Sequence, residues 1–511
     1  MNRPNILWIC TDQQRSDSLG CAGNSIVQPP NIDSIAENGT RFTRHITPMQ
    51  MCSPSRASMA TGLLQRNHQL VTNGRALSET IPTVMSLLAA DGYRTHGVGK
   101  QHLQPLLAPA EHNMPDSRAF WQTPESRSWR GPYYGFQLID LLLGESDTAQ
   151  IAGHYANWLR NNHPDAVDLL KPEHAQLPPN QELDEIWVSG MPAELHYNSW
   201  ITNCAADFIS GASQDESPFF MFVSYPDPHH PFDPPEPYDK RYDPADMPLP
   251  QITKADLASR PPYCETLFPK DRDFTELYWS ADTGIEAGVL YTTEHLNPET
   301  LQTAIAYTYS QIEMIDDGIG KILQTLHDKG LAENTIIIFT SDHGDYLGDH
   351  GLLHKGPASY RGITEIPLLM SGPTIKKGQT VSGLTSNVDL APTLLSLCGV
   401  THDPVSFDGV SLTPMLSGER PTVRSHTFGE YHPTSLKHLY NQTIYTDRWR
   451  YTIYPQMAEW GELFDLENDP AEQHNLFFSA DSQPIRAELN HLLATEFPPQ
   501  PEAGSLVISR W

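Results

Sequence analysis

Cysteine and positive charge are both scarce in this sequence. Its 511 residues include only six cysteines, which form no Cys-x-x-Cys pair, so neither a disulfide framework nor a zinc ribbon is indicated. Lysines and arginines number 33 against 62 aspartates and glutamates, which gives a formal net charge of −29. That balance argues against a nucleic-acid-binding protein and against docking on anionic membranes, since both need a basic surface. It is compatible with a small anionic substrate, because a local group of cations can reverse the field inside a pocket.

Long hydrophobic runs are also missing, and no segment approaches the length of a membrane span. The first apolar run covers only Ile6 to Cys10, and no small-residue cleavage site follows it, so we expect no signal peptide and a cytoplasmic location. Hydrophobic residues still make up 39% of the chain, which is enough for a sizeable core. The length exceeds one typical domain, so we expect a large domain with a smaller one.

Four apolar runs end abruptly in polar, reactive residues. They cover residues 5–10, 94–99, 219–225 and 335–340. Continuous Ile, Val and Phe runs of this length are typical of strands buried on both faces of a parallel sheet. Helical stretches at 79–91 and 300–328 lie between them, so we predict an α/β fold with a mostly parallel central sheet sandwiched by helices. Ligands bind at the carboxyl ends of such strands, so the polar residues after the four runs should converge.

Two regions depart from this alternation. Residues 105–200 are rich in Pro, Trp, Tyr and His with weak periodicity, and we interpret them as insertions over the site. After about residue 420 the pattern becomes strand-like, with a hairpin predicted around Asp447-Arg448. We therefore predict a large α/β domain over residues 1–420 and a small C-terminal α+β domain over 421–511 with a short antiparallel sheet.

The segment from Cys52 to Gly62 carries the most chemical information. Pro54 suits the first turn of a helix and Gly62 suits its end, so Cys52 is predicted at a helix N-terminus. Backbone N–H groups at such a terminus favour an anion, and Arg56 follows one turn later. The alternative is a buried cysteine that precedes an ordinary helix.

Cys52-Ser-Pro-Ser-Arg56, followed by a small-residue helix and Thr61-Gly62, resembles the signature of the type I, formylglycine-dependent sulfatases of the alkaline phosphatase-like superfamily. The resemblance extends from Asn5-Ile-Leu to the segment ending at Pro470. It implies a sulfuric ester hydrolase in which Cys52 is oxidised to formylglycine. A dedicated formylglycine-generating enzyme would read the motif and act as the maturation partner.

The same resemblance implies one divalent metal ion. Its ligands would be Asp12, Gln13, Asp342, His343 and the formylglycine oxygen at position 52, and carboxylates at two strand ends can indeed share a hard cation. Gln13 and His343 depart from the commonest family pattern, which has Asp and Asn there. Calcium is the family default, whereas an imidazole ligand favours manganese or another transition ion. The alternative for each aspartate alone is a helix cap.

Three further residues match sulfate-handling positions of the family. Lys100 would bind the sulfate oxygens, and His102 would be the base on the formylglycine hydrate. Lys355 matches the second sulfate-binding lysine. Asn73 is a candidate for hydrogen bonds to the substrate oxygens. A lone Lys or His is more often a solvated surface group, but the strand-end position of Lys100 and His102 favours function.

His229 matches the histidine that contacts the leaving oxygen in the family, and we assign that role to it rather than to His230. The implied mechanism begins when one hydroxyl of the hydrate attacks sulfur while Arg56, Lys100 and Lys355 neutralise the sulfuryl oxygens. His229 then protonates the leaving oxygen. The second hydroxyl loses a proton to His102, and C–O cleavage returns the aldehyde and releases inorganic sulfate.

Two other functions stay open. A formylglycine-dependent phosphonate monoester or phosphodiester hydrolase is the nearest, because Gln13, Asn73 and His343 resemble that branch, while Lys100 and His102 resemble the sulfatases. A non-catalytic binding protein on the same fold is more distant, because the whole set of reactive residues is present. The sequence leaves open whether the substrate is an aryl, alkyl or carbohydrate sulfate, and it does not determine the oligomeric state.

Overall fold

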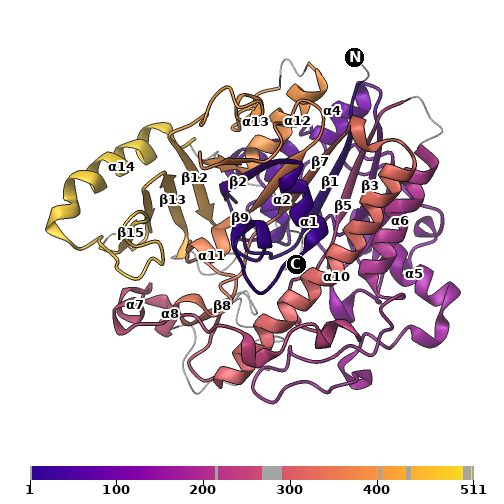
Figure 1. Cartoon of the computed structure of the whole chain (residues 1–511), viewed down its shortest axis with the longest axis horizontal. Helices are drawn as coiled ribbons and strands as arrows, with labels where there is room; N and C mark the ends of the chain where they lie inside the picture. Colours follow the sequence, from indigo (N-terminus) through magenta and orange to yellow (C-terminus); the bar gives the residue numbers. More distant parts are fainter. Residues whose placement is uncertain are drawn as a thin grey trace.

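The computed structural model describes residues 3–212, 217–266, 290–401, 405–432, 439–457, 459–498 and 508. Its centre is a nine-stranded, mostly parallel sheet with the strand order β10-β2-β9-β7-β1-β5-β3-β4, in which β11 also pairs with β2 (Figure 1). The strands are β1 (Asn5–Thr11), β2 (Gly39–Ile46), β3 (Arg94–Gly99), β4 (Leu138–Leu141), β5 (Phe219–Ser224), β7 (Thr335–Ser341), β9 (Glu365–Ser371), β10 (Gln379–Val381) and β11 (Thr385–Ser386). The predicted α/β class is confirmed, and β9 is the strand that runs antiparallel to both its neighbours.

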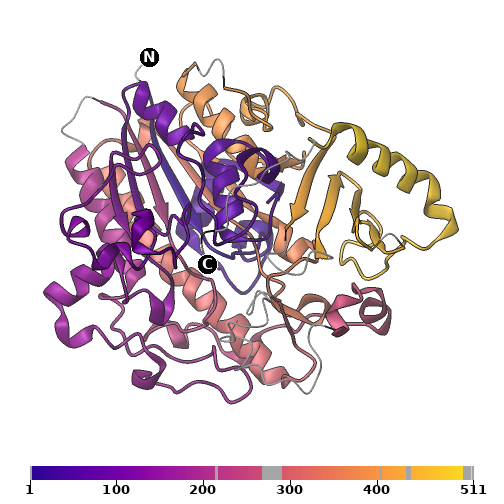
Figure 2. The same cartoon turned by 180° about the vertical axis from the view of Figure 1, so that it is seen from behind.

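Helices cover both faces of this sheet, as the two opposite views show (Figures 1 and 2). One face carries α1 (Pro30–Glu37), α5 (Gly153–Asn162), α6 (Tyr197–Ala212) and α10 (Pro298–Asp328). The other carries α2 (Cys52–Thr61), α4 (Val84–Ala90), α12 (Leu390–Cys398) and α13 (Thr413–Leu416). The central strand β1 serves both layers, because Leu7 and Ile9 pack on the first face and Ile6 and Trp8 on the second. Burial on both faces explains why its sequence is continuously apolar.

The two helices predicted at 79–91 and 300–328 are both present. α10 matches the stretch predicted at 300–328 almost residue for residue. α4 begins later than predicted, because Thr83 caps it: the Thr83 side chain accepts from the backbone N–H of Ser86, whose hydroxyl caps Thr83 in return. Gly92 follows the end of α4 with φ +88°, a conformation that suits glycine.

The region 105–200 is more regular than the sequence interpretation as insertions suggested. It contains α5 and also β4, a four-residue strand that pairs in parallel with β3 at the edge of the central sheet. β4 escaped the periodicity analysis because it is short and follows an irregular segment. Farther along, isolated bridges join Ile186 to Phe232 and Ser189 to Pro235, so this region also lies along the loop after β5.

A separate four-stranded antiparallel sheet lies at the C-terminal end of the chain. Its strands are β12 (His426–Tyr431), β13 (Asn441–Thr446), β14 (Trp449–Ile453) and β15 (Gly461–Asp465), in that order. β13 and β14 form the hairpin predicted around Asp447-Arg448. α14 (Gln483–Glu496) covers one face through Leu489 and Leu493 (Figure 1).

Several short elements complete the structure. They are α3 (Gln65–His68), α7 (Lys254–Ser259), α8 (Tyr263–Thr266), α11 (Arg361–Thr364) and the antiparallel pair β6 (Leu290–Thr292) with β8 (Leu352–His354). Among the helices in the described part of the chain, none combines the length and apolar character needed to cross a membrane.

Candidate active site

Side chains that follow three parallel strands meet at one edge of the central sheet. Asp12 follows β1, Lys100 follows β3 and Asp342 follows β7. Lys100 Nζ lies 2.8 Å from Asp12 Oδ2, although 88 residues separate them, and the backbone N–H of Gln13 donates to Asp342 Oδ1 at 3.2 Å. All of these side chains are buried. The predicted convergence at the carboxyl ends therefore occurs, as parallel strand topology requires.

Cys52 is the first residue of α2, at the end nearest this cluster. The backbone of Met51 is extended, and Gly62 ends the helix at φ +69°. Lys355 Nζ lies 3.2 Å from the Cys52 sulfur, and His343 Nε2 lies 3.3 Å from it. Burial and Asp12 oppose ionisation, but Lys355, Lys100 and His343 outweigh them and hold the pKa of the Cys52 thiol well below its usual value.

Arg56 joins the two carboxylates from the next turn of α2. Its Nε donates to Asp342 Oδ2 at 2.8 Å and its Nη2 to Asp12 Oδ2 at 3.0 Å. Its Nη1 donates to the Lys100 carbonyl and to the Ser224 hydroxyl, each at 2.8 Å. The guanidinium therefore joins four strand ends, those of β1, β3, β5 and β7. Burial raises the pKa of Asp12, but Lys100, His229 and Arg56 reverse that effect and keep it well below its usual range.

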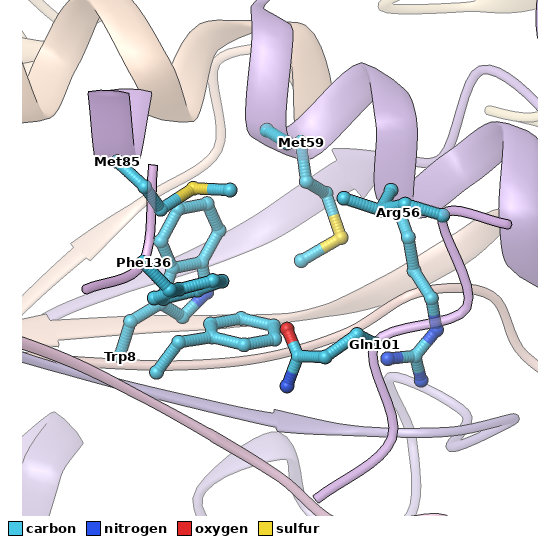
Figure 3. A pocket seen from close by; sticks show the side chains of 9 residues that line it. Trp8, Arg56, Met59, Met85, Gln101 and Phe136 are labelled. Carbon is cyan, nitrogen blue, oxygen red and sulfur yellow. The ribbon is translucent and has the colours of Figure 1, made fainter. Parts of the chain in front are cut away.

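A small apolar cavity lies behind Arg56. It is lined by Trp8, Met59, Met85 and Phe136 together with Gln101 and Arg56 (Figure 3). Figure 3 shows the arginine guanidinium beyond Gln101, away from the methionine side chains. This apolar surround excludes water from one side of the charge cluster, which strengthens the electrostatic interactions inside it.

Four side chains could bind a metal ion together. One ligand atom from each of Asp12, Cys52, Asp342 and His343 lies within 4.8 Å of the others. His343 Nδ1 donates to the Gly344 carbonyl at 2.9 Å, which leaves its Nε2 lone pair directed at the group. Metal-binding histidines are held in this way.

Gln13 adds an observation that favours a resident cation. Its Nε2 has two hydrogen-bond acceptors nearby, but its Oε1 is buried without a partner among the described residues. A buried carbonyl oxygen without a donor is costly, and a cation would satisfy it. The two carboxylates and the imidazole of the group, with the unpartnered Gln13 oxygen as a further candidate ligand, fit a divalent ion.

Lys355 and His229 form a close pair beside the metal group. Lys355 Nζ donates to His229 Nε2 at 2.7 Å, and His229 Nδ1 donates to the His230 carbonyl. Nζ of Lys355 also lies 3.4 Å from His343 Nε2. The pair therefore connects the sulfur of Cys52 to an imidazole that can receive and return a proton.

Among the described residues, His102 and Asn73 each have buried polar atoms without a hydrogen-bond partner. Neither ring nitrogen of His102 has a hydrogen-bond partner within the described ranges, and its backbone lies at φ +56°. Asn73 Oδ1 accepts from the backbone N–H of Ser53 at 3.3 Å. The Asn73 Nδ2 is buried and has no hydrogen-bond partner among the described residues. Such atoms suit a bound substrate or water.

Sequence reasoning missed Glu145 and Ser224. Glu145 Oε2 lies 3.0 Å from Lys100 Nζ, and a quarter of its side chain is exposed. Burial opposes ionisation, but Lys100 and His229 lower the pKa of Glu145. Glu145 follows β4, so recognising that strand would have pointed to it by the same strand-end rule. Ser224 ends β5 and was visible in the sequence as the last small residue of an apolar run.

Comparison with known proteins agrees with this geometry. The family model described as Sulfatase matches residues 4–400, and the model described as N-sulphoglucosamine sulphohydrolase, C-terminal, matches residues 348–497. The chain belongs to the sulfatase family. An arylsulfatase of Clostridium perfringens is 30% identical over 94% of this chain and 91% of its own.

Two further similarities bear on the activity. An N-acetylglucosamine-6-O-sulfatase of Bacteroides thetaiotaomicron is 26% identical over 96% of this chain and 86% of its own. The crystal structure of a phosphonate monoester hydrolase of Agrobacterium radiobacter superimposes with a TM-score of 0.77 at 28% identity, covering 96% of this chain and 95% of that one. The protein is thus a sulfatase-family hydrolase, and both the sulfatase prediction and its runner-up have relatives.

Proposed function

We propose that this sulfatase-family enzyme hydrolyses a small sulfate ester through formylglycine formed from Cys52. The observation that carries the proposal is the position of the Cys52 sulfur, 3.2 Å from Lys355 Nζ and within the four-residue metal group. A group derived from this side chain would lie against the Lys355 ammonium and beside the proposed metal ligands Asp12, Asp342 and His343. Arg56, Lys100 and Lys355 supply the positive charge that a sulfuryl group requires.

We assign each residue a role in this reaction. A formylglycine hydrate supplies a nucleophilic hydroxyl, and later a second hydroxyl whose deprotonation releases sulfate by C–O cleavage. Lys100 and Lys355 bind the sulfuryl oxygens. His229, whose Nε2 lies 2.7 Å from Lys355 Nζ, protonates the leaving oxygen, and Lys355 keeps its positive charge. His102, whose ring nitrogens are free of partners in the described residues, takes the proton from the second hydroxyl.

The ligand set suits a divalent ion held by Asp12, Gln13, Asp342 and His343, with residue 52 beside them. When bound, this ion polarises the attacking hydroxyl and the sulfuryl oxygens. One imidazole nitrogen among oxygen donors favours manganese over calcium. Asn73 Nδ2 is the donor that we assign to the substrate oxygens.

The second candidate activity is hydrolysis of a phosphonate monoester or phosphodiester. Gln13, Asn73 and His343 support it, as does the similarity to the phosphonate monoester hydrolase. A phosphodiester is a monoanion like a sulfate monoester, so the same cations would bind both. Lys100 and His102 favour the sulfatase, because they resemble the arrangement that sulfatases have at these two positions.

Two parallel measurements test the proposal. Peptide mass spectrometry across residues 45–66, on protein co-produced with a formylglycine-generating enzyme, reports the state of Cys52. Hydrolysis of 4-nitrophenyl sulfate and of bis(4-nitrophenyl) phosphate, measured on the same sample, ranks the two substrate classes by kcat/KM.

Aldehyde at position 52 with preferred release of sulfate is the expected result. Aldehyde with faster phosphodiester turnover moves the assignment to the second candidate. An unmodified thiol in the presence of the converting enzyme contradicts the mechanism, and sulfate release by that sample would require another nucleophile.

A further inference from the structure

A second group of ionisable side chains lies beside the candidate active site and takes no part in the mechanism above. Its members are Glu185, His230 and His354, with only 7%, 5% and 1% of their surfaces exposed. They come from three distant segments. Glu185 precedes α6, His230 lies in the loop after β5, and His354 ends β8.

Backbone pairing brings these segments together. The N–H of Phe232 donates to the Glu185 carbonyl at 2.8 Å, beside the bridge between Ile186 and Phe232. The side chains then meet: His354 Nε2 lies 2.9 Å from Glu185 Oε2, and the rings of His230 and His354 are 3.8 Å apart at 61°. One ligand atom from each residue falls within 4.8 Å of the others.

Two imidazoles and a carboxylate could bind a transition metal, so the proton positions decide what this group does. Gln13 Nε2 lies 2.5 Å from Asp345 Oδ2 and 3.0 Å from His230 Nδ1. The carboxylate can only accept, so the amide nitrogen must face it. His230 Nδ1 therefore also accepts from Gln13.

That hydrogen bond fixes the tautomer of His230. A neutral imidazole that accepts at Nδ1 carries its proton at Nε2, and so has no second lone pair for a metal ion. Turning the Gln13 amide over would free Nδ1 but would press Oε1 against the Asp345 carboxylate. The group is thus arranged for hydrogen bonding and does not offer three metal donors.

We propose that Glu185, His354 and His230 form a buried support that fixes the orientation of the Gln13 amide, with His230 and Asp345 as the two positioning residues. The two ends of an amide are nearly equal in shape, so sterics alone do not select which end faces the ion. Two acceptors, His230 Nδ1 and Asp345 Oδ2, capture the nitrogen and leave Oε1 for the cation. The inference rests on the metal-dependent function proposed above.

The same support lies next to two other active-site residues. The His230 ring stacks on that of His229, with centroids 4.1 Å apart at 28°. His354 immediately precedes Lys355 in the chain, so its contact with Glu185 restrains the backbone that carries the lysine. A segment of the region 105–200 is thereby linked to Gln13 through Glu185, His354 and His230.

Metal binding, measured apart from turnover, tests the proposal. Full-length protein depleted of metal by a chelator is titrated with Mn²⁺ by calorimetry, and the bound ion is followed by electron paramagnetic resonance. His230→Leu should raise the Kd for Mn²⁺ by about 10- to 100-fold, the usual effect of losing a partner of a metal ligand. His230→Asn should restore affinity to within about threefold of wild type, since its amide oxygen can accept from Gln13 in place of Nδ1.

A matched control separates this effect from the loss of any buried histidine. His96→Leu removes an imidazole that pairs with Asp140 at 2.9 Å near the start of β3, and it should leave the Kd unchanged. If His230→Leu does not fold, Asp345→Asn provides the test, because an amide there permits Gln13 to turn over. Its control is Asp349→Asn, which removes the same charge in the same loop but contacts Arg15 instead of Gln13.

Each outcome has a distinct meaning. Weaker Mn²⁺ binding in His230→Leu, restored in His230→Asn, supports the proposal. Unchanged affinity in both His230→Leu and Asp345→Asn overturns it while leaving the proposed function intact. Two Mn²⁺ ions per wild-type chain, one of them lost in Glu185→Gln, would overturn it by showing that the support is itself a metal site. Wild-type protein that binds no divalent ion would overturn both the inference and the function on which it rests.

Discussion

Two buried charge clusters in this protein differ in how their charges are paired. Under the C-terminal sheet, the fully buried Arg450 contacts the carboxylates of Glu462 and Glu472. Glu472 also accepts from the backbone N–H of Arg361 at 2.7 Å. Among the described residues, both arginines of this cluster, Arg450 and Arg361, contact carboxylates.

The candidate active site contains one cation with a different kind of partner. Lys355 has no carboxylate partner in the described part of the chain, and its ammonium contacts the sulfur of Cys52 and the rings of His229 and His343. Lys355 differs from Arg450 in that its charge faces a sulfur and two imidazoles, so no carboxylate of the described residues neutralises it before a ligand binds. Both clusters are buried, so burial does not distinguish them. What distinguishes the candidate active site is a lysine whose partners are a sulfur and imidazoles, whereas the partners of Arg450 include two carboxylates.

The largest expected difference concerns two buried cysteines, one in each region. Cys52→Ala should lower kcat for a sulfate ester by at least about 10⁴-fold, because it removes the nucleophile, with little change in the unfolding midpoint. Cys264→Ala, in the apolar cluster with Tyr346 and Phe464, should leave kcat within about twofold and lower stability by roughly 1 kcal/mol. Steady-state assays and thermal unfolding of both variants test this, and equal loss of activity in the two would contradict it.

Breaking the paired cluster should affect stability instead of catalysis. Arg450→Met leaves Glu462 and Glu472 buried without their cation, which should cost roughly 3–5 kcal/mol in the free energy of unfolding. Arg448→Met, on the same hairpin but with an exposed side chain, should have a much smaller effect on stability, because solvent screens an exposed ion pair. Urea unfolding measures both, and kcat per folded enzyme should be unchanged. A fall in that kcat would mean that the two clusters are coupled.

Removal and return of the metal ion test whether the candidate active site, unlike the Arg450 cluster, is stabilised by a bound cation. Divalent ion at a hundredfold excess over its Kd should stabilise the chelator-treated enzyme by about 2.7 kcal/mol, because the ion binds the folded chain only. Gln13→Ala should reduce that gain at the same ion concentration, whereas Arg448→Met should not. Thermal unfolding with and without Mn²⁺ measures it. A midpoint that does not respond to any divalent ion would contradict a metal site at Asp12 and Asp342.

Sequence patterns predicted the parts of this site that depend on local rules. Apolar runs that end in polar residues located Asp12, Lys100 and Asp342, since parallel strands place their carboxyl ends together. The helix signals around Cys52 were equally local. Glu145 and Glu185 could not be found in this way, because their positions depend on a four-residue strand and on isolated bridges. Nothing in the periodicity of residues 105–200 encodes which distant loop they pair with.

The smallest predicted effect concerns the buried carboxylate of Glu430, where α3 of the large domain contacts β12 of the C-terminal sheet. Arg66 of α3 donates to Glu430 of β12 at 2.7 Å, and His432 lies 2.9 Å from the same carboxylate. Burial opposes ionisation, but His432 and Arg66 outweigh it and lower the pKa of Glu430 to about 2, from 4.5.

Because the folded-state pKa lies below the unfolded one, the stability that Glu430 contributes is fully present above about pH 4.5. It is lost as the pH falls through 2. A shift of this size corresponds to roughly 3 kcal/mol, and a glutamine would keep part of the hydrogen bonding, so Glu430→Gln should cost roughly 2 kcal/mol at pH 7. The difference between Glu430→Gln and wild type in the free energy of unfolding, measured with urea, should decrease steadily from pH 5 to pH 2. A constant difference across that range would show that the charge of Glu430 contributes nothing, and that its stabilising role is one of packing alone.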